Sequence, residues 1–280
     1  MKKKLFITAI VGAALALTVG CLAGCGSSSD EAEGGYKVAA ELSSEHYAAG
    51  FKLGNDDMAN AVTKTLIEMD EDGTVQELRE KYADQGISYE NWCLDASTAK
   101  TDGAEVPAGT KFTVGFDAEY PPYGYIADDG SYTGFDLDLA AEVAERNGWE
   151  FTAEPIDWDS KDALIDSGQI TCIWNGFTYE GRENDYSFSA LYMLNSQVIV
   201  TKADSDVASI DDLAGKNVMT QSGSAAFELL SDGGDFAEQA KAFADLTAVP
   251  DYSTAFMNLD SGAVDAIVCD YSVAAYYLAK

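Results

Sequence analysis

Histidine is almost absent from this chain, because His46 is the single one among 280 residues. Histidine is the usual general base beside a Ser or Cys nucleophile, so the sequence offers no such pair. It also contains neither the Gly-x-Ser-x-Gly elbow of many hydrolases nor a phosphate-binding P-loop. Motifs therefore assign little catalytic chemistry, and we expect no enzyme activity.

Basic residues are scarce as well: Lys and Arg number 17 against 48 Asp and Glu, which gives a formal net charge of −31. Nucleic-acid binding depends largely on Lys and Arg at phosphates, so nucleic acid is not an expected partner. Such acidity favours solubility and opposes non-specific association, without indicating a fold. It is compatible with a cationic ligand.

Cysteines are few and irregularly spaced. Beyond the N-terminal region only Cys93, Cys172 and Cys269 occur, which indicates neither a disulfide framework nor a zinc site. Cys172 and Cys269 each lie in an apolar run typical of a buried strand. We expect both to be small core residues rather than reactive thiols.

One acidic stretch has the beginning of a calcium loop, with Glu68, Asp70, Asp72 and Gly73 in order. Arg79 occupies the twelfth position, where such a loop needs a bidentate Glu. We interpret the stretch as a solvated helix end. Neither a metal nor a cofactor is expected.

The N-terminus has the plan of an export signal: three lysines at positions 2–4 precede an apolar run from Leu5 to Val19. The sequence Leu-Ala-Gly-Cys follows the run and ends at Cys25, and it resembles the lipobox of bacterial lipoproteins, where that cysteine is acylated. We therefore predict a signal peptide over residues 1–24, lipidation at Cys25, and a flexible tether over residues 25–35. The alternative is a transmembrane anchor, but the run is shorter than the roughly 20 residues that a spanning helix needs.

The first folded segment is predicted to contain two strands and two helices. Strand-like runs span Tyr36–Leu42 and His46–Leu53, and an apolar stripe at helical spacing follows between Met58 and Met69. A second, shorter helix is expected from Thr74. Residues 96–109 are small and polar with no periodicity, which is typical of a linker.

Strands and helices then alternate to the end of the chain. The predicted strands span residues 112–116, 151–156, 170–174, 197–201, 217–220, 246–249 and 266–269, and the helices begin at Phe135, Ser209, Tyr252 and Tyr271. This alternation predicts an α/β fold with parallel-rich sheets flanked by helices. The length of the chain favours two lobes.

A series of motifs in this second segment closely resembles the polar amino-acid-binding proteins of ABC importers, the bacterial solute-binding proteins of family 3. The motifs are residues 117–123 (DAEYPPY), 134–138 (GFDLD), 175–178 (NGFT) with Arg182, 187–189 (SFS), 211–216 (DDLAGK), 221–224 (QSGS) and 265–270 (DAIVCD). The resemblance implies the two-lobed, type II periplasmic-binding-protein-like fold with a hinge between the lobes.

The order of the segments differs from that family. Residues 36–95 resemble its C-terminal part, with Tyr47–Lys52 followed by two helices, yet here they come first. We interpret the chain as circularly permuted, since permutation succeeds where termini lie close together. The predicted parts are 36–43 as the last strand of lobe 2, 44–95 as the C-terminal part of lobe 1, 96–109 as linker, 110–198 as lobe 1 and 199–280 as lobe 2. The alternatives are a fragment of a tandem array that swaps segments with a neighbour, and an error in the gene model.

The resemblance also implies a ligand site. The predicted ligand-binding residues are Asp117, Tyr120, Trp158, Gly176, Thr178, Arg182, Gln221, Ser222, Ser224 and Asp270. A guanidinium fork meets a carboxylate with two parallel hydrogen bonds, so Arg182 would hold the ligand carboxylate, with Thr178 and Ser224 completing that pocket. Asp270 would take the ammonium group, aided by the Gly176 carbonyl.

Two aromatic walls, Tyr120 and Trp158, would enclose the ligand, and Trp158 could offer a face to a cation. Each residue also has a plainer interpretation. Arg182 could form a surface ion pair, Asp270 could cap the helix that begins at Tyr271, and the aromatic rings could be packing residues.

The expected function is that of a lipid-anchored protein on the extracytoplasmic face of the cell membrane. It would capture a polar amino acid by lobe closure and deliver it to the permease subunits of an ABC importer, acting as a monomer. Alternatives are a periplasmic dehydratase of the same fold, for which Glu119 is the candidate acid or base, and a degenerate paralogue that binds nothing. Sequence does not indicate which amino acid is bound.

Overall fold

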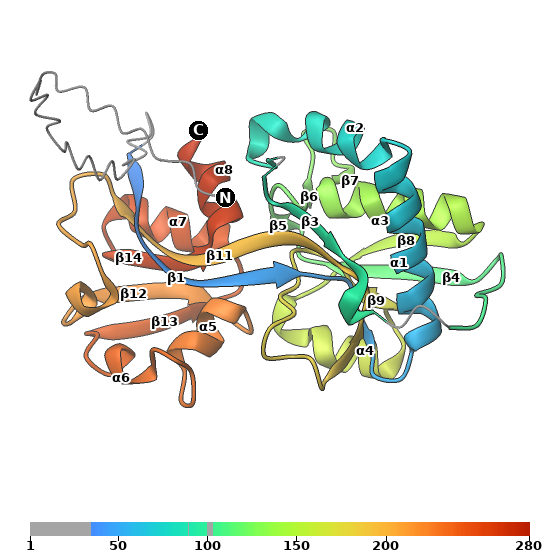
Figure 1. Cartoon of the computed structure of the whole chain (residues 1–280). Helices are drawn as coiled ribbons and strands as arrows, with labels where there is room; N and C mark the ends of the chain where they lie inside the picture. Colours follow the sequence, from blue (N-terminus) through green and yellow to red (C-terminus); the bar gives the residue numbers. More distant parts are fainter. Residues whose placement is uncertain (1–34, 89, 100–102) are drawn as a thin grey trace, which may run out of the picture.

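The computed structural model describes residues 35–88, 90–99 and 103–280. Two α/β lobes lie side by side, and the long strands β1 (Tyr36–Tyr47) and β11 (Leu191–Lys202) run between them (Figure 1). These two strands pair antiparallel, from Tyr36 opposite Lys202 to Tyr47 opposite Met193. The pair forms the connection across which the lobes meet.

Lobe 2 is built on a mixed sheet in the order β1-β11-β14-β12-β13, with β3 (Trp92–Asp95) on the far end of β11. Its parallel strands are β12 (Asn217–Gln221), β13 (Asp245–Val249) and β14 (Ala266–Asp270). Its helices are η4 (Ile210–Leu213), α5 (Ala225–Leu230), α6 (Ala237–Ala240), α7 (Tyr252–Ser261) and α8 (Tyr271–Leu278).

Alternation along β14 explains why both faces of this sheet are covered. Ile267 and Cys269 belong to the buried cluster that includes α7 and α8, whereas Ala266 and Val268 pack in the cluster that includes α5. Successive side chains of a strand point to opposite faces, so this apolar strand needs helices on both sides.

Lobe 1 holds a five-stranded sheet in the order β10-β2-β9-β4-β8. The strands are β2 (Gly50–Lys52), β4 (Lys111–Phe116), β8 (Glu150–Pro155), β9 (Cys172–Ile173) and β10 (Tyr186–Phe188). The helices are α1 (Asp56–Glu71), α2 (Thr74–Lys81), η1 (Ala83–Gln85), η2 (Ala96–Thr98), α3 (Phe135–Asn147), η3 (Trp158–Ser160) and α4 (Lys161–Ser167). A small sheet of β5 (Glu119–Tyr120), β6 (Gly124–Ile126) and β7 (Tyr132–Thr133) completes the lobe.

Residues 36–95 contact both lobes. Within this segment β1 lies in the sheet of lobe 2 and β2 lies between β10 and β9 of lobe 1, while α1 and α2 pack on α3. The Tyr36 ring contacts Phe256 at 5.3 Å between centroids, and Phe256 stacks on Tyr277 at 3.8 Å. The start of β1 and the helix α8 therefore both pack against α7 in lobe 2.

The fold class is as predicted, with three differences in detail. The expected pair of strands over residues 36–53 is one long strand and a short one, because Ser43, Ser44 and Glu45 continue the ladder with β11 despite their polarity. The expected helix at Ser209 is a single 3-10 turn. The sheets are also mixed, since β1, β2, β10 and β11 pair antiparallel around the parallel strands.

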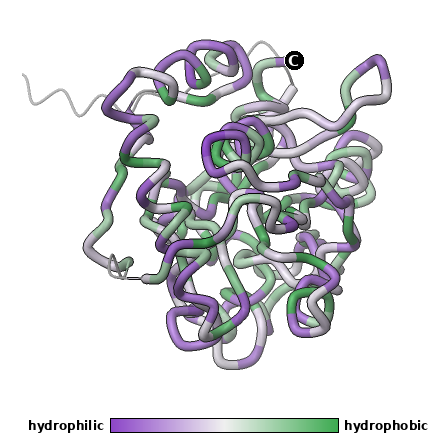
Figure 2. Tube along the Cα trace, turned by 90° about the vertical axis from the view of Figure 1, so that its right-hand side faces the viewer, coloured by the Kyte–Doolittle hydropathy of each residue, from purple (hydrophilic) through white to green (hydrophobic). Residues whose placement is uncertain are grey.

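The core contains the residues expected there. Cys172 and Cys269 are fully buried free cysteines, as predicted, and Cys93 is half-buried and free. Figure 2 shows hydrophilic stretches mainly on the outer turns of the fold. In the described part of the chain, no helix is both long and apolar enough to cross a bilayer. The predicted signal peptide, tether and lipidated Cys25 lie outside the described residues.

Candidate functional site

A small cavity of about 10 Å³ lies where the two lobes face each other. Its lining is Tyr120, Trp158, Gly176, Phe177, Thr178 and Arg182 from lobe 1, and Gln221, Ser224, Ala225 and Asp270 from lobe 2. Eight of the ten ligand-binding residues predicted from the sequence lie in this lining. Phe177 and Ala225 were not predicted as ligand-binding residues. Phe177 lies within the motif at 175–178 and Ala225 directly follows the motif at 221–224, so position next to a motif was the only sequence signal for them.

Strand direction brings these residues together. Gln221 ends β12 and Asp270 ends β14, and these strands are parallel neighbours. In lobe 1, Gly176 and Thr178 follow β9, which is parallel to β4. The carboxyl ends of parallel strands meet at one edge of a sheet, which is where open α/β sheets bind ligands. The two such edges face each other across the cavity.

Arg182 is the buried cation of the cavity, with 6% of its surface exposed. Its Nη1 donates to the Thr178 carbonyl at 3.1 Å, and its guanidinium lies 5.1 Å from the centre of the Phe177 ring. Its Nη2 lies 2.7 Å from Glu228 Oε1 on α5 of lobe 2. The plainer interpretation of Arg182 as an ion-pair residue therefore holds in part: the pair exists and Glu228 is half exposed, but Arg182 itself is buried.

Asp270 is the buried anion on the opposite lobe, with 4% of its surface exposed. Its Oδ1 accepts hydrogen bonds from Tyr47 Oη at 2.8 Å, Asn195 Nδ2 at 2.9 Å and Gln197 Nε2 at 2.8 Å. Asp270 occupies the N-cap position of α8, as its plainer interpretation expects, but its carboxylate makes no capping hydrogen bond to that helix. These donors stabilise a carboxylate without neutralising it.

Glu45 is a site residue that sequence reasoning missed. Its Oε1 accepts from Asn195 Nδ2 at 2.7 Å, Gln197 Nε2 at 2.8 Å and Thr178 Oγ1 at 3.2 Å. Burial, followed by the charge of Asp270, raises the pKa of Glu45 to about 8. One indication of this role was present in the sequence: Glu45 lies two residues before Tyr47, a spacing that places both side chains on one face of a strand.

The two predicted aromatic walls line the cavity and also have aromatic neighbours. The Tyr120 ring lies 6.0 Å from Tyr123 and 6.1 Å from Tyr252 between centroids, and Trp158 meets Phe177 edge-on at 5.9 Å. The packing interpretation therefore holds for Tyr120 and Trp158, and their role as walls around a ligand stays a prediction.

Gly176 is required by the approach of Tyr120. It adopts a left-handed conformation with φ 58°, and a Cβ there would lie 2.8 Å from the Tyr120 ring.

Direct bonds join the lobes around the cavity. Asp117 Oδ2 accepts from Gln221 Nε2 at 2.5 Å, and Lys161 Nζ donates to the Gly223 carbonyl at 2.9 Å. Lys161, which sequence reasoning also missed, is almost fully buried and lies 5.5 Å from the Trp158 ring centre. Burial raises the pKa of Asp117 to about 6. These bonds hold the lobes together in the described conformation.

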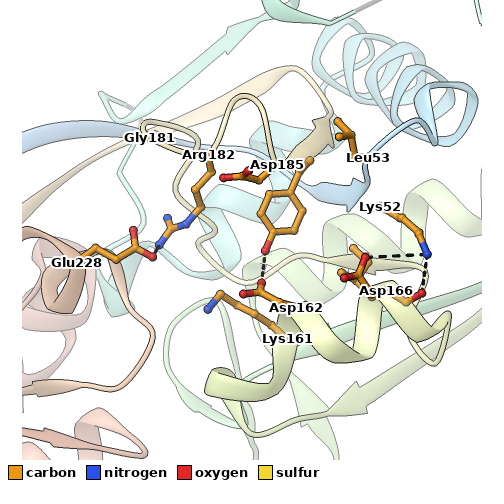
Figure 3. Close-up of a pocket in the computed structure, with 11 residues that line it drawn as sticks. Lys52, Leu53, Lys161, Asp162, Asp166, Gly181, Arg182, Asp185 and Glu228 are labelled. Carbon is orange, nitrogen blue, oxygen red and sulfur yellow. Dashed lines mark hydrogen bonds and ion pairs between the residues drawn. The ribbon is translucent and has the colours of Figure 1, made fainter. Parts of the chain in front are cut away.

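A second hollow adjoins the cavity and shares Arg182 with it. Figure 3 shows Arg182 and Glu228 reaching toward each other from opposite sides of this hollow, with Lys161 nearby. The hollow contains cations and acids in nearly equal number. Most of them already have a partner: Arg182 pairs with Glu228, Lys52 donates to the Asp166 carbonyl, Lys161 donates to the Gly223 carbonyl, and Asp162 accepts from Tyr186.

Three predicted candidates, Asp117, Ser222 and Glu119, do not line the cavity, and Asp117 instead accepts a hydrogen bond from Gln221. Ser222 donates its backbone N–H to the Val249 carbonyl at 2.8 Å, which continues the pairing of β12 with β13. Glu119 is exposed on β5 and does not line the cavity, so the acid or base expected for a dehydratase is not placed there. Among the described residues, no group of three or more His, Cys, Asp or Glu side chains could hold a metal ion.

Comparison with known proteins gives consistent results. Residues 112–249 match the model of the bacterial extracellular solute-binding proteins, family 3. The chain is 32% identical over 160 residues to the L-cystine-binding protein TcyJ of Escherichia coli (strain K12), a match covering 56% of this chain and 58% of that protein. It is also 32% identical over 134 residues to the arginine-binding extracellular protein ArtP of Bacillus subtilis (strain 168), covering 48% of this chain and 52% of that protein.

Among solved structures, an ABC uptake transporter substrate-binding protein from Streptococcus pneumoniae with bound histidine has 35% sequence identity and a TM-score of 0.55. That match covers 60% of this chain and 69% of the other. The chain thus spans somewhat over half the length of the two curated relatives and over two thirds of this solved structure. From its motifs, its two lobes and these matches, the chain belongs to the bacterial extracellular solute-binding proteins of family 3.

Proposed function

We propose that this protein captures a polar amino acid between its lobes and presents it to the permease subunits of an ABC importer. The observation that carries the proposal is one cavity with a buried cation, Arg182, on lobe 1 and a buried anion, Asp270, on lobe 2. A zwitterionic amino acid offers the two complementary charges. Because the partners lie on different lobes, such a ligand binds the closed state better and shifts the population toward it.

The relatives support this class of ligand without selecting one member. Their names refer to cystine and arginine, and the pneumococcal structure contains histidine. L-Arginine, L-histidine and L-cystine are therefore the first probes. Family membership and the export-signal pattern support an extracytoplasmic location, with attachment to the membrane through a lipid on Cys25.

A thermal-shift screen tests the proposed function. At least one of the 20 common amino acids or cystine should raise the melting temperature of the wild type. Arg182→Ala should abolish that shift, because the carboxylate loses its cation. Arg146→Ala is the matched control: it removes a surface arginine paired with Asp72 and Glu142, and the ligand-induced shift should persist. No shift with any amino acid, or an undiminished shift in Arg182→Ala, contradicts the proposal.

We also propose that the chain is a circular permutation of the family's order. The support is that residues 36–95 lie outside the matched range, yet supply β1 to one sheet and β2 to the other. The start of β1 and the end of α8 both pack near Phe256 in lobe 2, so a short link could join them.

A re-ordered chain tests the permutation. It begins at Gly103, runs to Lys280, continues through a short Gly-Ser link into Tyr36 and ends at Thr98. We expect a monomer by analytical ultracentrifugation, with the same amino-acid affinity as the original order. An original-order protein that is an obligate dimer would instead favour a swapped segment, and a re-ordered chain that does not fold would count against permutation.

A further inference from the structure

A second carboxyl group lies against Asp270 where the connecting strands meet the cavity. This is Glu45 on β1, which like Asp270 has 4% of its surface exposed. The side-chain amide nitrogen of Asn195 lies 2.7 Å from Glu45 Oε1 and 2.9 Å from Asp270 Oδ1. The amide nitrogen of Gln197 lies 2.8 Å from each of the same two oxygens. The two carboxyl groups therefore converge on the same pair of donors.

The surroundings of Glu45 contain acids and neutral groups. Tyr47 and Tyr123 are buried next to the pair. On the outer side, Glu45 lines a hollow together with Glu180, Glu228, Asp232 and Asp235, and the lining of that hollow contains no Lys, Arg or His. The neighbouring His46 pairs with Glu180, its Nδ1 lying 2.6 Å from Glu180 Oε1.

Two buried carboxylates this close together repel each other strongly. Ionising both therefore costs a large free energy, and one of them keeps a proton. Amide nitrogens supply partial charge only, which does not offset two full negative charges. Burial and the charge of Asp270 raise the pKa of Glu45, which makes Glu45 the protonated member in the ligand-free protein near neutral pH.

We propose that Glu45 is a positioning residue for the ligand's ammonium group, holding a proton beside Asp270 in the free protein and releasing it when the ammonium group binds. This inference rests on the proposed function. On binding, the O–H bond of the Glu45 carboxyl breaks, the electron pair stays on its oxygen and the proton passes to solvent. The ammonium charge then balances a pair of carboxylates instead of one. The ligand class is an amino acid with a free, protonated amino group.

The proposal differs from a purely structural role. If Glu45 only anchored Asn195 and Gln197 at the connection, ligand binding would leave its protonation unchanged. Proton release on binding is therefore the discriminating quantity. The sign follows from linkage: ligand prefers the deprotonated pair, so affinity rises with pH up to the pKa of Glu45 in the free protein and is flat above it.

The experiment is calorimetry of the full-length protein, titrated with L-arginine or, if arginine does not bind, with L-cystine. Each titration is run in phosphate and in Tris, whose different ionisation enthalpies report the number of protons exchanged. At pH 6.5 the wild type should release up to about one proton per ligand, with affinity rising by at most about tenfold per pH unit toward pH 8. The isosteric variant Glu45→Gln should release that proton no longer, and its affinity should vary less with pH.

His46→Gln is the matched control, because His46 adjoins Glu45 on β1 and pairs with Glu180, outside the contacts between Glu45 and Asp270. It should keep the proton release of the wild type. Asp117 and Asp136 remain in every variant, so the difference between wild type and Glu45→Gln isolates Glu45.

Equal proton release by wild type and Glu45→Gln overturns the inference but leaves the proposed function intact. The same holds for a wild type that binds without releasing protons, which needs no variant to fold. Failure of every amino acid to bind overturns the proposed function, and with it this inference.

Discussion

Arg182 already has a carboxylate partner within the protein. Glu228 lies 2.7 Å from Arg182 Nη2 and comes from the opposite lobe, so it occupies part of the guanidinium that we assign to the ligand carboxylate. Because Glu228 is half exposed, its attraction to Arg182 is screened by water. Glu228 should therefore be a weak competitor that a ligand displaces.

Glu228→Gln tests this competition. Removing the charge should strengthen amino-acid binding by up to about fivefold, which corresponds to an exposed pair worth at most about 1 kcal/mol. Calorimetric dissociation constants measure the change. Glu238→Gln on α6 is the control, since it removes a similar surface pair with Lys241 outside the cleft. Weaker binding in Glu228→Gln would mean that Glu228 supports the ligand instead of competing with it.

The motifs identified most of the charged and aromatic residues of the cavity, because Arg182, Asp270 and Tyr120 each lie within or beside a recognisable stretch. Trp158 lies outside these stretches and was predicted only from the aromatic walls that the family resemblance implies. Glu45 and Lys161 escaped this reasoning. Acidic and basic residues are usually solvated, and their burial here comes from contacts with residues more than 60 positions away. The residues that neighbour Glu45 and Lys161 in the sequence do not predict such long-range contacts.

Among secondary-structure elements, the helices with clear apolar periodicity were located accurately. The structure has α3 at Phe135–Asn147, α7 at Tyr252–Ser261 and α8 at Tyr271–Leu278, close to the predicted positions. Strand β3 was not predicted, because its pairing with β11 supplies a stabilisation that its own sequence does not show. Strand β1 was predicted in two parts, since polar residues near Glu45 interrupt the alternation that the ladder with β11 then carries through.

Helix α3 begins with a buried acid that joins three elements. Asp136 Oδ2 accepts from the Gly176 N–H at 2.6 Å, after β9, and from Tyr192 Oη at 2.7 Å, on β11. Burial raises the pKa of Asp136 to about 7. The folded state thus holds a proton that the unfolded chain releases above about pH 4. Stability from this group is greatest below pH 4 and declines as pH rises to about 7.

Urea unfolding at pH 5 and pH 7.5 tests this pH dependence. The wild type should lose on the order of a few kcal/mol between these values, because Glu45, Asp117 and Asp136 all have raised pKa values. Asp136→Asn should lose less. The exposed Asp129→Asn should behave like the wild type. A free energy of unfolding that increases over this range in the wild type would contradict the account of these carboxyl groups.

At the scale of the whole molecule, direct bonds such as Gln221 to Asp117 and Lys161 to the Gly223 carbonyl join the two lobes. Gln221→Ala removes the hydrogen bond to Asp117 and leaves a buried carboxyl without that donor, at an expected cost of about 1–3 kcal/mol to closure. The free protein should then have a larger radius of gyration by small-angle X-ray scattering and bind its amino acid more weakly.

Ligand should restore the compact shape of Gln221→Ala, since the charges of Arg182 and Asp270 remain. Gln239→Ala on α6 is the control and should scatter like the wild type with and without ligand. Identical scattering of free Gln221→Ala and free wild type would show that this bond does not control closure.

The central claim is that an amino acid bridges a cation on lobe 1 and an anion on lobe 2. Calorimetry on Asp270→Asn, with the amino acid identified by the thermal-shift screen, tests it most directly, and the exposed Asp245→Asn provides the matched control. Loss of the buried partner should cost on the order of 3–5 kcal/mol, so affinity should fall about a hundredfold or more, while the control keeps the affinity of the wild type. An Asp270→Asn affinity within threefold of the wild type would contradict the account.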